Sequence, residues 1–277
     1  MPELPEVETV RRGLDAAVLG RRIDRVEVGR ERTVRRTSRE ALIAGLQNTA
    51  IVRTWRRGKY LIADLDSGDS VMIHLRMSGR LLLAQRGSPR PPHSHVVMGM
   101  QDIEVRFVDP RTFGEVVVFD PERTAEQVPE LQRLGVDPIA DPFDQRVLAA
   151  ALAGTTRGIK SVLLDQTRVA GLGNIYTDEV LHRARLRYDR PADALRRSDI
   201  GRLAEAITEV LTAAIDAGGS TLADTQYVDM EGRTGSFQES HLVYARRDEP
   251  CLTCGRSTIR RAVVSGRSTF FCPRCQK

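Results

Sequence analysis

The first twenty residues carry apolar side chains at helical spacing. Val7, Val10, Leu14 and Val18 fall on one stripe, and Gly20 follows it. This pattern predicts an amphipathic helix that ends just before the glycine. A second helix is predicted at residues 38–46, which begin at a serine.

The rest of the first half has the pattern of β-strands. Short runs rich in β-branched and aromatic residues occur at 23–28, 55–65, 71–76, 80–84, 103–108 and 115–119. Short strands at such close spacing are typical of an antiparallel sandwich or barrel. We therefore expect a β-rich first domain.

The pattern changes again at residues 120–142, where prolines and acids indicate a linker with a short helix. Helical spacing follows at 145–154, 160–186 and 198–219. In the last of these, we expect Ser198 to be the N-cap and Gly218 the stop. One face of that helix carries Leu203, Ile207, Val210, Leu211 and Ile215.

Length, composition and charge limit the class of protein. A chain of 277 residues favours two domains. No apolar run reaches membrane-spanning length, and an N-terminus with Glu3, Glu6 and Glu8 lacks the features of a signal peptide. We expect a cytosolic monomer. The net charge is +5, yet residues 246–277 alone hold eight Lys/Arg and two acids, so the C-terminus is a basic lobe suited to polyanions.

The strongest chemical signal is a pair of Cys-x-x-Cys knuckles. Cys251, Cys254, Cys272 and Cys275 are the only cysteines of the chain. Four thiolates in this arrangement predict one closed, structural Zn²⁺ site, whereas two disulfides are disfavoured in the cytosol. Between the knuckles, four arginines and no acid flank a Ser265-Gly266 turn, which indicates a hairpin that presents arginine to phosphates. A zinc ribbon can also bind proteins.

Two further motifs have both a structural and a functional interpretation. Glycines and Asn174 precede a helical run, as in an ordinary helix start or in a phosphate site. Met77 lies in one polar turn, and Arg111 and Phe113 lie in another. Such apolar residues usually pack beneath their own loops, but two of them with an arginine could also wedge into a base stack and fill the place of a flipped base.

Taken together, these motifs resemble one enzyme family. The start PELPEVET, the runs HLRMSG and DPRTFG, the stretch from KSVLLDQ to AGLGNIY and the end FFCPRCQK are similar to bacterial formamidopyrimidine-DNA glycosylases. The resemblance implies an α+β multidomain fold: an N-terminal β-sandwich with an N-terminal helix (1–125), a linker (126–142), a helix-two-turn-helix domain with a lesion loop (143–235) and a zinc-finger hairpin (236–277). It also implies a base-excision repair enzyme that removes oxidised purines, such as 8-oxoguanine and formamidopyrimidines, from double-stranded DNA and cuts the strand by β,δ-elimination.

The resemblance also assigns roles to residues. It implies that Pro2, once Met1 is removed, forms a Schiff base with the sugar, as an α-amino group with a usable neutral fraction can do. Glu3 is then the acid for ring opening, and Glu6 orients the terminus. Lys59, expected on the strand 58–65, and Arg267 are implied as phosphate ligands and proton donors. The DNA-contacting positions are His93, Lys160, Asn174 and the intercalating Met77, Arg111 and Phe113.

Three features depart from the family pattern, and two alternatives stay open. The finger has 17 residues between its inner cysteines, one more than expected, and Arg157 is the only basic residue near Thr155, where the family often has a DNA contact. The lesion loop LADTQYVDMEG is also an uncommon version. The alternatives are an endonuclease VIII-like enzyme for oxidised pyrimidines and a catalytically silent DNA-binding relative. The PELPEVE start and the triad of Met77, Arg111 and Phe113 disfavour the first alternative. The presence of Pro2, Glu3 and Lys59 disfavours the second.

Overall fold

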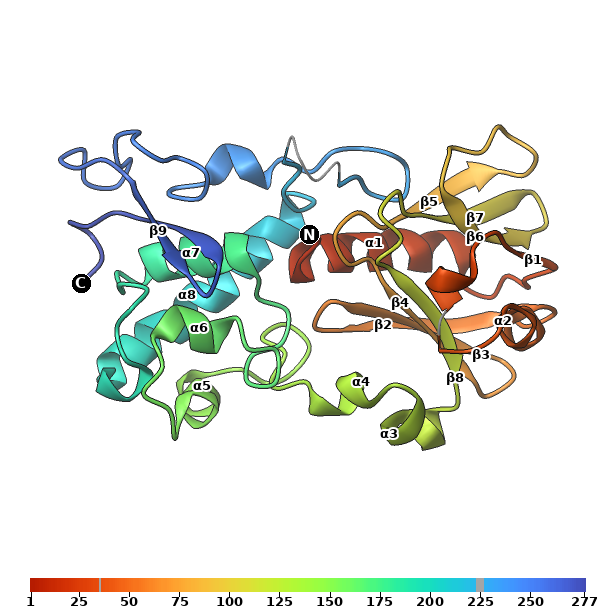
Figure 1. Cartoon of the computed structure of the whole chain (residues 1–277), viewed down its shortest axis with the longest axis horizontal. Coiled ribbons are helices and arrows are strands. Elements are labelled where there is room, and N and C mark those ends of the chain that lie inside the picture. Colours follow the sequence, from red (N-terminus) through yellow and green to blue (C-terminus); the bar gives the residue numbers. More distant parts are fainter. Residues whose placement is uncertain (35, 223–226) are drawn as a thin grey trace. The chain divides into compact units, whose positions relative to one another are not determined.

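The computed structural model describes residues 1–34, 36–222 and 227–277. The chain divides into two compact units (Figure 1). The first comprises 1–132 and 217–236, and the second comprises 133–216 and 237–277. We expected 217–235 to group with the preceding helices. In space this segment belongs to the first unit, because its hydrogen bonds run to residues of that unit, such as Glu6 and Leu83.

The first unit begins with helix α1 (Leu4–Val18). Val7, Val10, Leu14 and Val18 are all at most 1% exposed, which confirms the predicted apolar stripe. Pro5 occupies the first turn, where its missing N–H is harmless. Gly20 follows with a positive φ of 76°, which ends the helix as predicted.

Two four-stranded antiparallel sheets share one core with α1. The first has the order β1-β6-β7-β5 and the second the order β2-β3-β4-β8. The strands are β1 (Arg25–Val28), β2 (Ile51–Arg57), β3 (Tyr60–Leu65), β4 (Ser70–His74), β5 (Arg80–Gln85), β6 (Ser94–Met100), β7 (Ile103–Val108) and β8 (Glu115–Phe119). Leu61, Ile73 and Val105 are among the buried residues of the core that the two sheets share.

Two details differ from the predicted strands. The stretch 55–65 forms two strands, β2 and β3, joined by Gly58 and Lys59, and Gly58 has a positive φ of 56°. Strand β6 was not predicted, because His95 and Gly99 interrupt the β-type pattern. It nevertheless pairs with both β1 and β7.

Short helices lie between and after the strands of this unit. They are η1 (Glu31–Val34), α2 (Arg39–Leu46), η2 (Pro121–Arg123), α3 (Thr124–Gln127) and α4 (Pro129–Arg133), which extends one residue beyond the unit. The Ser38 hydroxyl accepts the Ala41 N–H, so this serine is the N-cap of α2. Residues 120–133, expected to be a linker with one short helix, are therefore mostly helical.

The second unit is helical and ends in a hairpin. Its helices are α5 (Gln145–Leu152), α6 (Ile159–Leu163), α7 (Asn174–Arg183), η3 (Ala192–Ala194), α8 (Arg197–Asp216) and η4 (Phe237–Ser240). The apolar face predicted for α8 is buried. Ser198 is not its N-cap, because the helix begins at Arg197, and the Asp199 carboxylate accepts the Arg196 N–H.

The hairpin pairs β9 (Arg260–Val264) with β10 (Arg267–Phe271). Ser265 and Gly266 form its turn, both with positive φ, as a tight hairpin requires.

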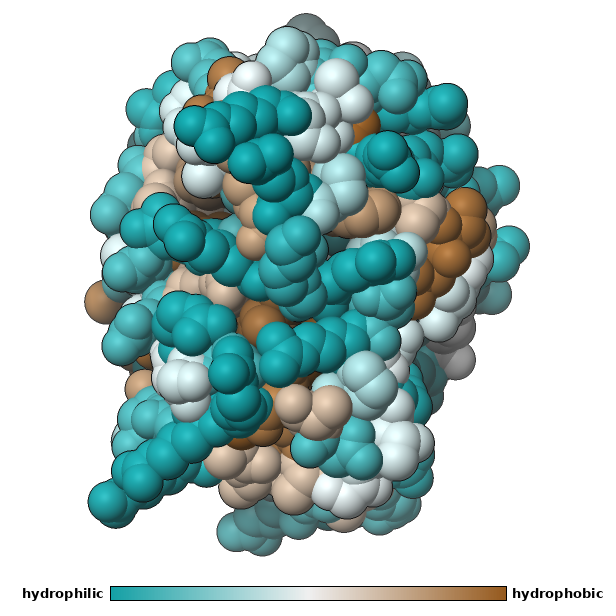
Figure 2. All heavy atoms as spheres, turned by 90° about the vertical axis from the view of Figure 1, so that its left-hand side faces the viewer, coloured by the Kyte–Doolittle hydropathy of each residue, from teal (hydrophilic) through white to brown (hydrophobic). Residues whose placement is uncertain are grey.

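The face of the molecule that Figure 2 shows is mainly hydrophilic, with apolar side chains between the polar ones. Among the described residues, no helix is both long and apolar enough to cross a membrane.

Candidate functional site

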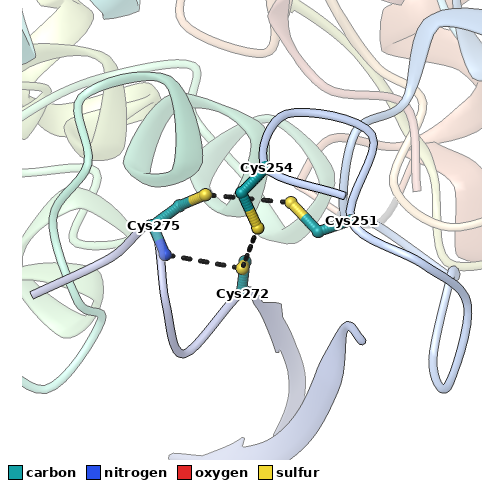
Figure 3. Close-up of side chains that lie close together, drawn as sticks. All are labelled: Cys251, Cys254, Cys272 and Cys275. Atoms are coloured by element: carbon teal, nitrogen blue, oxygen red, sulfur yellow. Dashed lines mark hydrogen bonds between the residues drawn. The ribbon is translucent and has the colours of Figure 1, made fainter. Parts of the chain in front are cut away.

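The four cysteines converge in the second unit (Figure 3). Their sulfur atoms all lie within 4.8 Å of one another. The Cys251–Cys275 and Cys254–Cys272 sulfur distances are 3.8 and 3.9 Å, whereas a disulfide requires about 2.0 Å. A tetrahedral zinc ion with Zn–S bonds of about 2.3 Å separates its sulfurs by about 3.8 Å. The residues therefore fit one structural zinc, and four thiolates leave no position for a catalytic water.

Helix α7 holds the finger through a stripe of polar side chains. Asn174, Asp178 and His182 are spaced four residues apart, so they share one helix face. The Asn174 amide donates to the Ser268 carbonyl at 2.8 Å, and Asp178 accepts the Phe270 N–H at 2.8 Å. His182 is hydrogen-bonded to Thr253, between the first two cysteines, and to Gln276. The helix thus contacts both the hairpin and the zinc knuckles.

Glu179, the next residue of α7, holds the approach to the finger. Its buried carboxylate accepts three successive N–H groups, from Leu242, Val243 and Tyr244, at 2.7–3.0 Å. Burial raises the pKa of Glu179, although these hydrogen bonds act in the opposite direction. We did not predict Asp178, Glu179 or His182 as site residues, because acids and a histidine in a helix have the same pattern as a solvated face.

Two residues that were expected to contact DNA differ in their exposure to solvent. Arg267, the first residue of β10, is exposed beside the hairpin turn. Lys160 is 0% exposed, and its ammonium group bonds to Asp178 at 2.7 Å. Burial raises the pKa of the Asp178 carboxyl, and the Lys160 ammonium group acts in the opposite direction. A direct contact between Lys160 and a phosphate does not fit this geometry.

In the first unit, the amino terminus is enclosed. Pro2 and Glu3 are buried, and Glu3 lies directly before α1. The Glu6 carboxylate reaches back and accepts the Glu3 N–H at 2.7 Å, a capping arrangement that fixes the first residues. This geometry agrees with the predicted orienting role of Glu6.

Glu6 also fixes the segment 217–236. Its second oxygen accepts the Ser220 N–H at 2.7 Å. Later in the same segment, the Tyr227 hydroxyl donates to the Glu6 carbonyl at 3.4 Å. The Tyr227 carbonyl accepts from the Thr221 hydroxyl. A Cβ on Gly235 would lie 2.2 Å from the Gly219 carbonyl, so only glycine permits this close approach. Residues 223–226 of the predicted lesion loop lie outside the described residues.

Lys59 lies in the two-residue turn between β2 and β3, not on the strand as expected. It is only 6% exposed. The turn places its side chain at the end of the hairpin, whereas a strand position would have placed it on a sheet face.

Three loops of the first unit are joined by Asp109, which is fully buried. Its carboxylate accepts the Ser78 hydroxyl and the N–H groups of Arg111 and Gly114. Its own N–H donates to the His93 carbonyl at 3.0 Å. Asp109 therefore fixes the loops that carry Met77, His93 and Phe113. We did not predict Asp109, because an aspartate in a turn has the same sequence pattern whether its carboxylate is buried or exposed.

The tips themselves are open. Met77 is 39% exposed and Phe113 is 38% exposed, so neither is packed fully beneath its loop. The Arg111 guanidinium lies 5.0 Å from the centre of the Phe113 ring, within the range of a cation–π contact. A Cβ on Gly114 would lie 2.4 Å from the Phe107 ring, which explains the glycine next to the tip.

A cavity of about 610 Å³ on the other face of the β2-β3-β4-β8 sheet contains none of these residues. Trp55, Phe119 and Leu131 are among its lining residues. The predicted site residues therefore lie outside this open pocket. They belong instead to turns, a helix start and a hairpin, as is usual for a protein that reads an extended polymer.

Comparisons with known proteins cover the whole chain. Residues 1–116 match the formamidopyrimidine-DNA glycosylase N-terminal domain, 134–226 match the H2TH domain of the same enzymes, and 248–277 match a zinc finger found in FPG and IleRS.

Full-length relatives give the same result. The chain is 46% identical to a formamidopyrimidine-DNA glycosylase of Rhodopseudomonas palustris, with complete coverage of both chains. It is 43% identical to that of Synechococcus sp., over 100% of this chain and 99% of the relative. A solved complex of Lactococcus lactis Fpg with DNA containing an abasic site is 37% identical, with a TM-score of 0.91 over 99% of both chains. The chain belongs to the formamidopyrimidine-DNA glycosylase family.

Proposed function

We propose that this protein excises oxidised purines, such as 8-oxoguanine and formamidopyrimidines, from double-stranded DNA and then cleaves the strand. Family membership over the full length supports this activity. The observation that carries it is the enclosed amino terminus, where Glu6 fixes the Glu3 backbone beside Pro2.

The proposed chemistry begins with the Pro2 amine, freed by removal of Met1. Its lone pair attacks C1′ of the damaged nucleotide, the bond to the base breaks, and the amine loses its proton. A proton delivered to the sugar ring oxygen then breaks the C1′–O4′ bond and opens the ring to an iminium. This iminium has no N–H proton to lose, so it acts as an electron sink. Loss of a C2′ proton then expels the 3′ phosphate, and a second elimination expels the 5′ phosphate. Protons are required at the sugar ring oxygen and at the leaving groups.

Three residues supply or direct those protons in this proposal. Glu3 is the acid at the sugar, a role supported by its burial and by its place next to Pro2 in the chain. Lys59 binds a phosphate and serves the first elimination. Arg267 binds a second phosphate and serves the second elimination, a role that its exposed position permits.

Recognition of the damaged nucleotide is assigned to the tips. Met77, Arg111 and Phe113 enter the duplex where the base leaves the stack, and the exposure of both apolar tips supports this. His93 and Asn174 contact the DNA backbone.

The decisive experiment is borohydride trapping. The protein is mixed with a duplex that contains 8-oxoguanine opposite cytosine, and borohydride reduces the iminium to a stable covalent adduct. We expect an adduct whose mass places the DNA on Pro2. A matched sample that retains Met1, verified by mass spectrometry, should give no adduct. An equally strong adduct from that sample would exclude the Pro2 mechanism.

A further inference from the structure

Lys160 has the burial of a core residue and the hydrogen bonds of a structural cation. Its side chain is 0% exposed. The ammonium group contacts three acceptors: Asp178 Oδ1 at 2.7 Å, Thr269 Oγ1 at 2.9 Å and the Ser268 carbonyl at 3.2 Å. One of these acceptors is a buried carboxylate, so the charge of the ammonium group is paired inside the protein.

All three acceptors either lie in strand β10 or are hydrogen-bonded to it. Ser268 and Thr269, two of the three acceptors, follow Arg267 directly in β10. The third acceptor, Asp178, uses its other oxygen to accept the Phe270 N–H at 2.8 Å. Asn174 adds a second hydrogen bond to the Ser268 carbonyl. Three successive residues of β10 are therefore fixed by α6 and α7.

The other neighbour of β10 among the described residues is strand β9. This strand has two exposed arginines at 260 and 261, and Arg261 bonds to the Ser268 hydroxyl. The hairpin turn that precedes Arg267 has both residues exposed. Arg267 pairs with Val264 in the β9–β10 ladder, and the buried Lys160–Asp178 pair holds the residues of β10 that follow Arg267.

We propose that Lys160 is a positioning residue. Together with Asp178 it fixes β10 in the register and orientation that bring Arg267 to the DNA backbone, and it does not bind DNA itself. The inference rests on the proposed function of Arg267.

The first test compares a single with a double substitution. In Lys160→Met, a side chain of similar length replaces the lysine and leaves the Asp178 carboxylate buried without its cation, which is strongly unfavourable. In Lys160→Met/Asp178→Asn, the charge is removed from both partners, and the amide oxygen still accepts the Phe270 N–H. We expect the single variant to bind a duplex with a tetrahydrofuran abasic-site analogue about tenfold or more weakly. The double variant should recover to within about threefold of the parent.

The competing role, a direct phosphate ligand, gives the opposite result. Removal of one phosphate contact lowers the slope of log affinity against log salt by about 0.9. If Lys160 bound DNA, this loss would occur in both variants, and Asp178→Asn would restore nothing. Equal weakening of both variants, with that change of slope, would overturn the proposal. If Lys160→Met does not fold, the double variant alone still decides, since the two roles differ in its affinity and slope.

A second measurement follows the reaction at Arg267. On a duplex with a natural abasic site, we expect both Lys160→Met and Arg267→Ala to raise the ratio of β- to δ-elimination products. Added to Arg267→Ala, the Lys160 substitution should change this ratio by less than about twofold, because both act through one group. A further independent change in the ratio would contradict the proposed coupling.

The chain offers a matched control. Arg183 and Glu209 form an ion pair in which both side chains are more than half exposed. Arg183→Met and Arg183→Met/Glu209→Gln make the same changes of charge on the surface of the same unit. Both should keep the parent's product ratio. Failure of the proposed function would appear separately, as an absence of excision and trapping in the parent protein itself.

Discussion

Glu6 and Ser220 are joined by a 2.7 Å hydrogen bond, although 214 residues separate them in the sequence. The same carboxylate holds the Glu3 N–H through its other oxygen. One side chain thus connects the start of α1, next to Pro2, with the segment that is expected to close over the damaged base. This connection leads to the first prediction.

Glu6→Gln should slow excision of 8-oxoguanine more than cleavage of a preformed abasic site. The amide has one acceptor oxygen, so it must place an NH₂ group against one of the two N–H donors. We expect a loss of about 1–3 kcal/mol in the free energy of unfolding. An abasic site has no base to hold, so its cleavage depends less on residues 217–222. Glu8→Gln is the control, because the described ion pairs of Glu8 are with Arg11, Arg12 and Arg56. Equal slowing of both reactions would contradict the connection.

Glu3→Gln should bind lesion-containing DNA at the parent's affinity and lose excision. The substitution keeps the shape of the side chain and removes its acid, and such a proton donor contributes about 10²–10⁴-fold to a rate. Single-turnover excision and a binding titration on the same duplex test this. If the variant excises at the parent rate, the acid is another residue.

Cys254→Ser should release zinc and abolish DNA binding while the first unit stays folded. Metal binding supplies much of the folding free energy of so small a hairpin. Zinc release by a colorimetric chelator, circular dichroism and DNA titration report the three outcomes. Unchanged affinity in a zinc-free variant would show that the finger is not needed for binding.

Phe113→Ala should reduce binding to lesion-containing DNA and leave stability nearly unchanged. Its ring is 38% exposed, so truncation removes little packing. The wedge should offset an unstacking penalty of a few kcal/mol, and the loss should be smaller on an abasic duplex, where less stacking is broken. Phe119→Ala, at a ring that is 4% exposed, is the control and should cost about 3–5 kcal/mol of stability. A lowered melting temperature of Phe113→Ala with unchanged discrimination would mean that the tip only packs.

His241 predicts a loss of stability in mild acid. Burial lowers the pKa of this histidine to about 4, from an ordinary value of 6.5. Between these pH values the imidazole is protonated in the unfolded chain and neutral in the folded chain. The free energy of unfolding therefore has its full value above pH 6.5 and falls as the pH drops toward 4. From pH 7.5 to 5, His241→Phe should lose about 2 kcal/mol less than the parent.

Denaturant unfolding at the two pH values, with zinc content checked in each sample, measures this difference. His93→Asn, at an exposed histidine, should retain the parent's pH dependence. Equal pH dependence of the parent and His241→Phe would exclude His241 as the cause.

Periodic and covalent features were readable from the sequence. The stripe of α1, the buried face of α8 and the spacing of the four cysteines depend on local geometry, which repeats along the chain. The Ser265-Gly266 turn was equally plain, because a tight hairpin needs residues that tolerate positive φ. The family was also recognisable, because each of its motifs is a short run of neighbouring residues.

The positions that depend on distant partners were not readable. Lys59 was expected on a strand, but pairing of Arg57 with Tyr60 places it in the turn. Lys160 was expected at the DNA, whereas Asp178 and β10 enclose it. The sequence does not distinguish a lysine whose charge is solvated from one whose charge is paired with a buried carboxylate.

Asp109 and Glu6 illustrate the remaining limit. Each is one acid among many in the sequence, yet Asp109 joins three loops and Glu6 joins two distant segments. The stripes of the longer helices, the zinc ligands and the chemical groups of the site follow from the order of residues along the chain. Which of these groups are buried and fixed depends on residues that folding brings together, as it does for Glu6 and Ser220 across 214 positions.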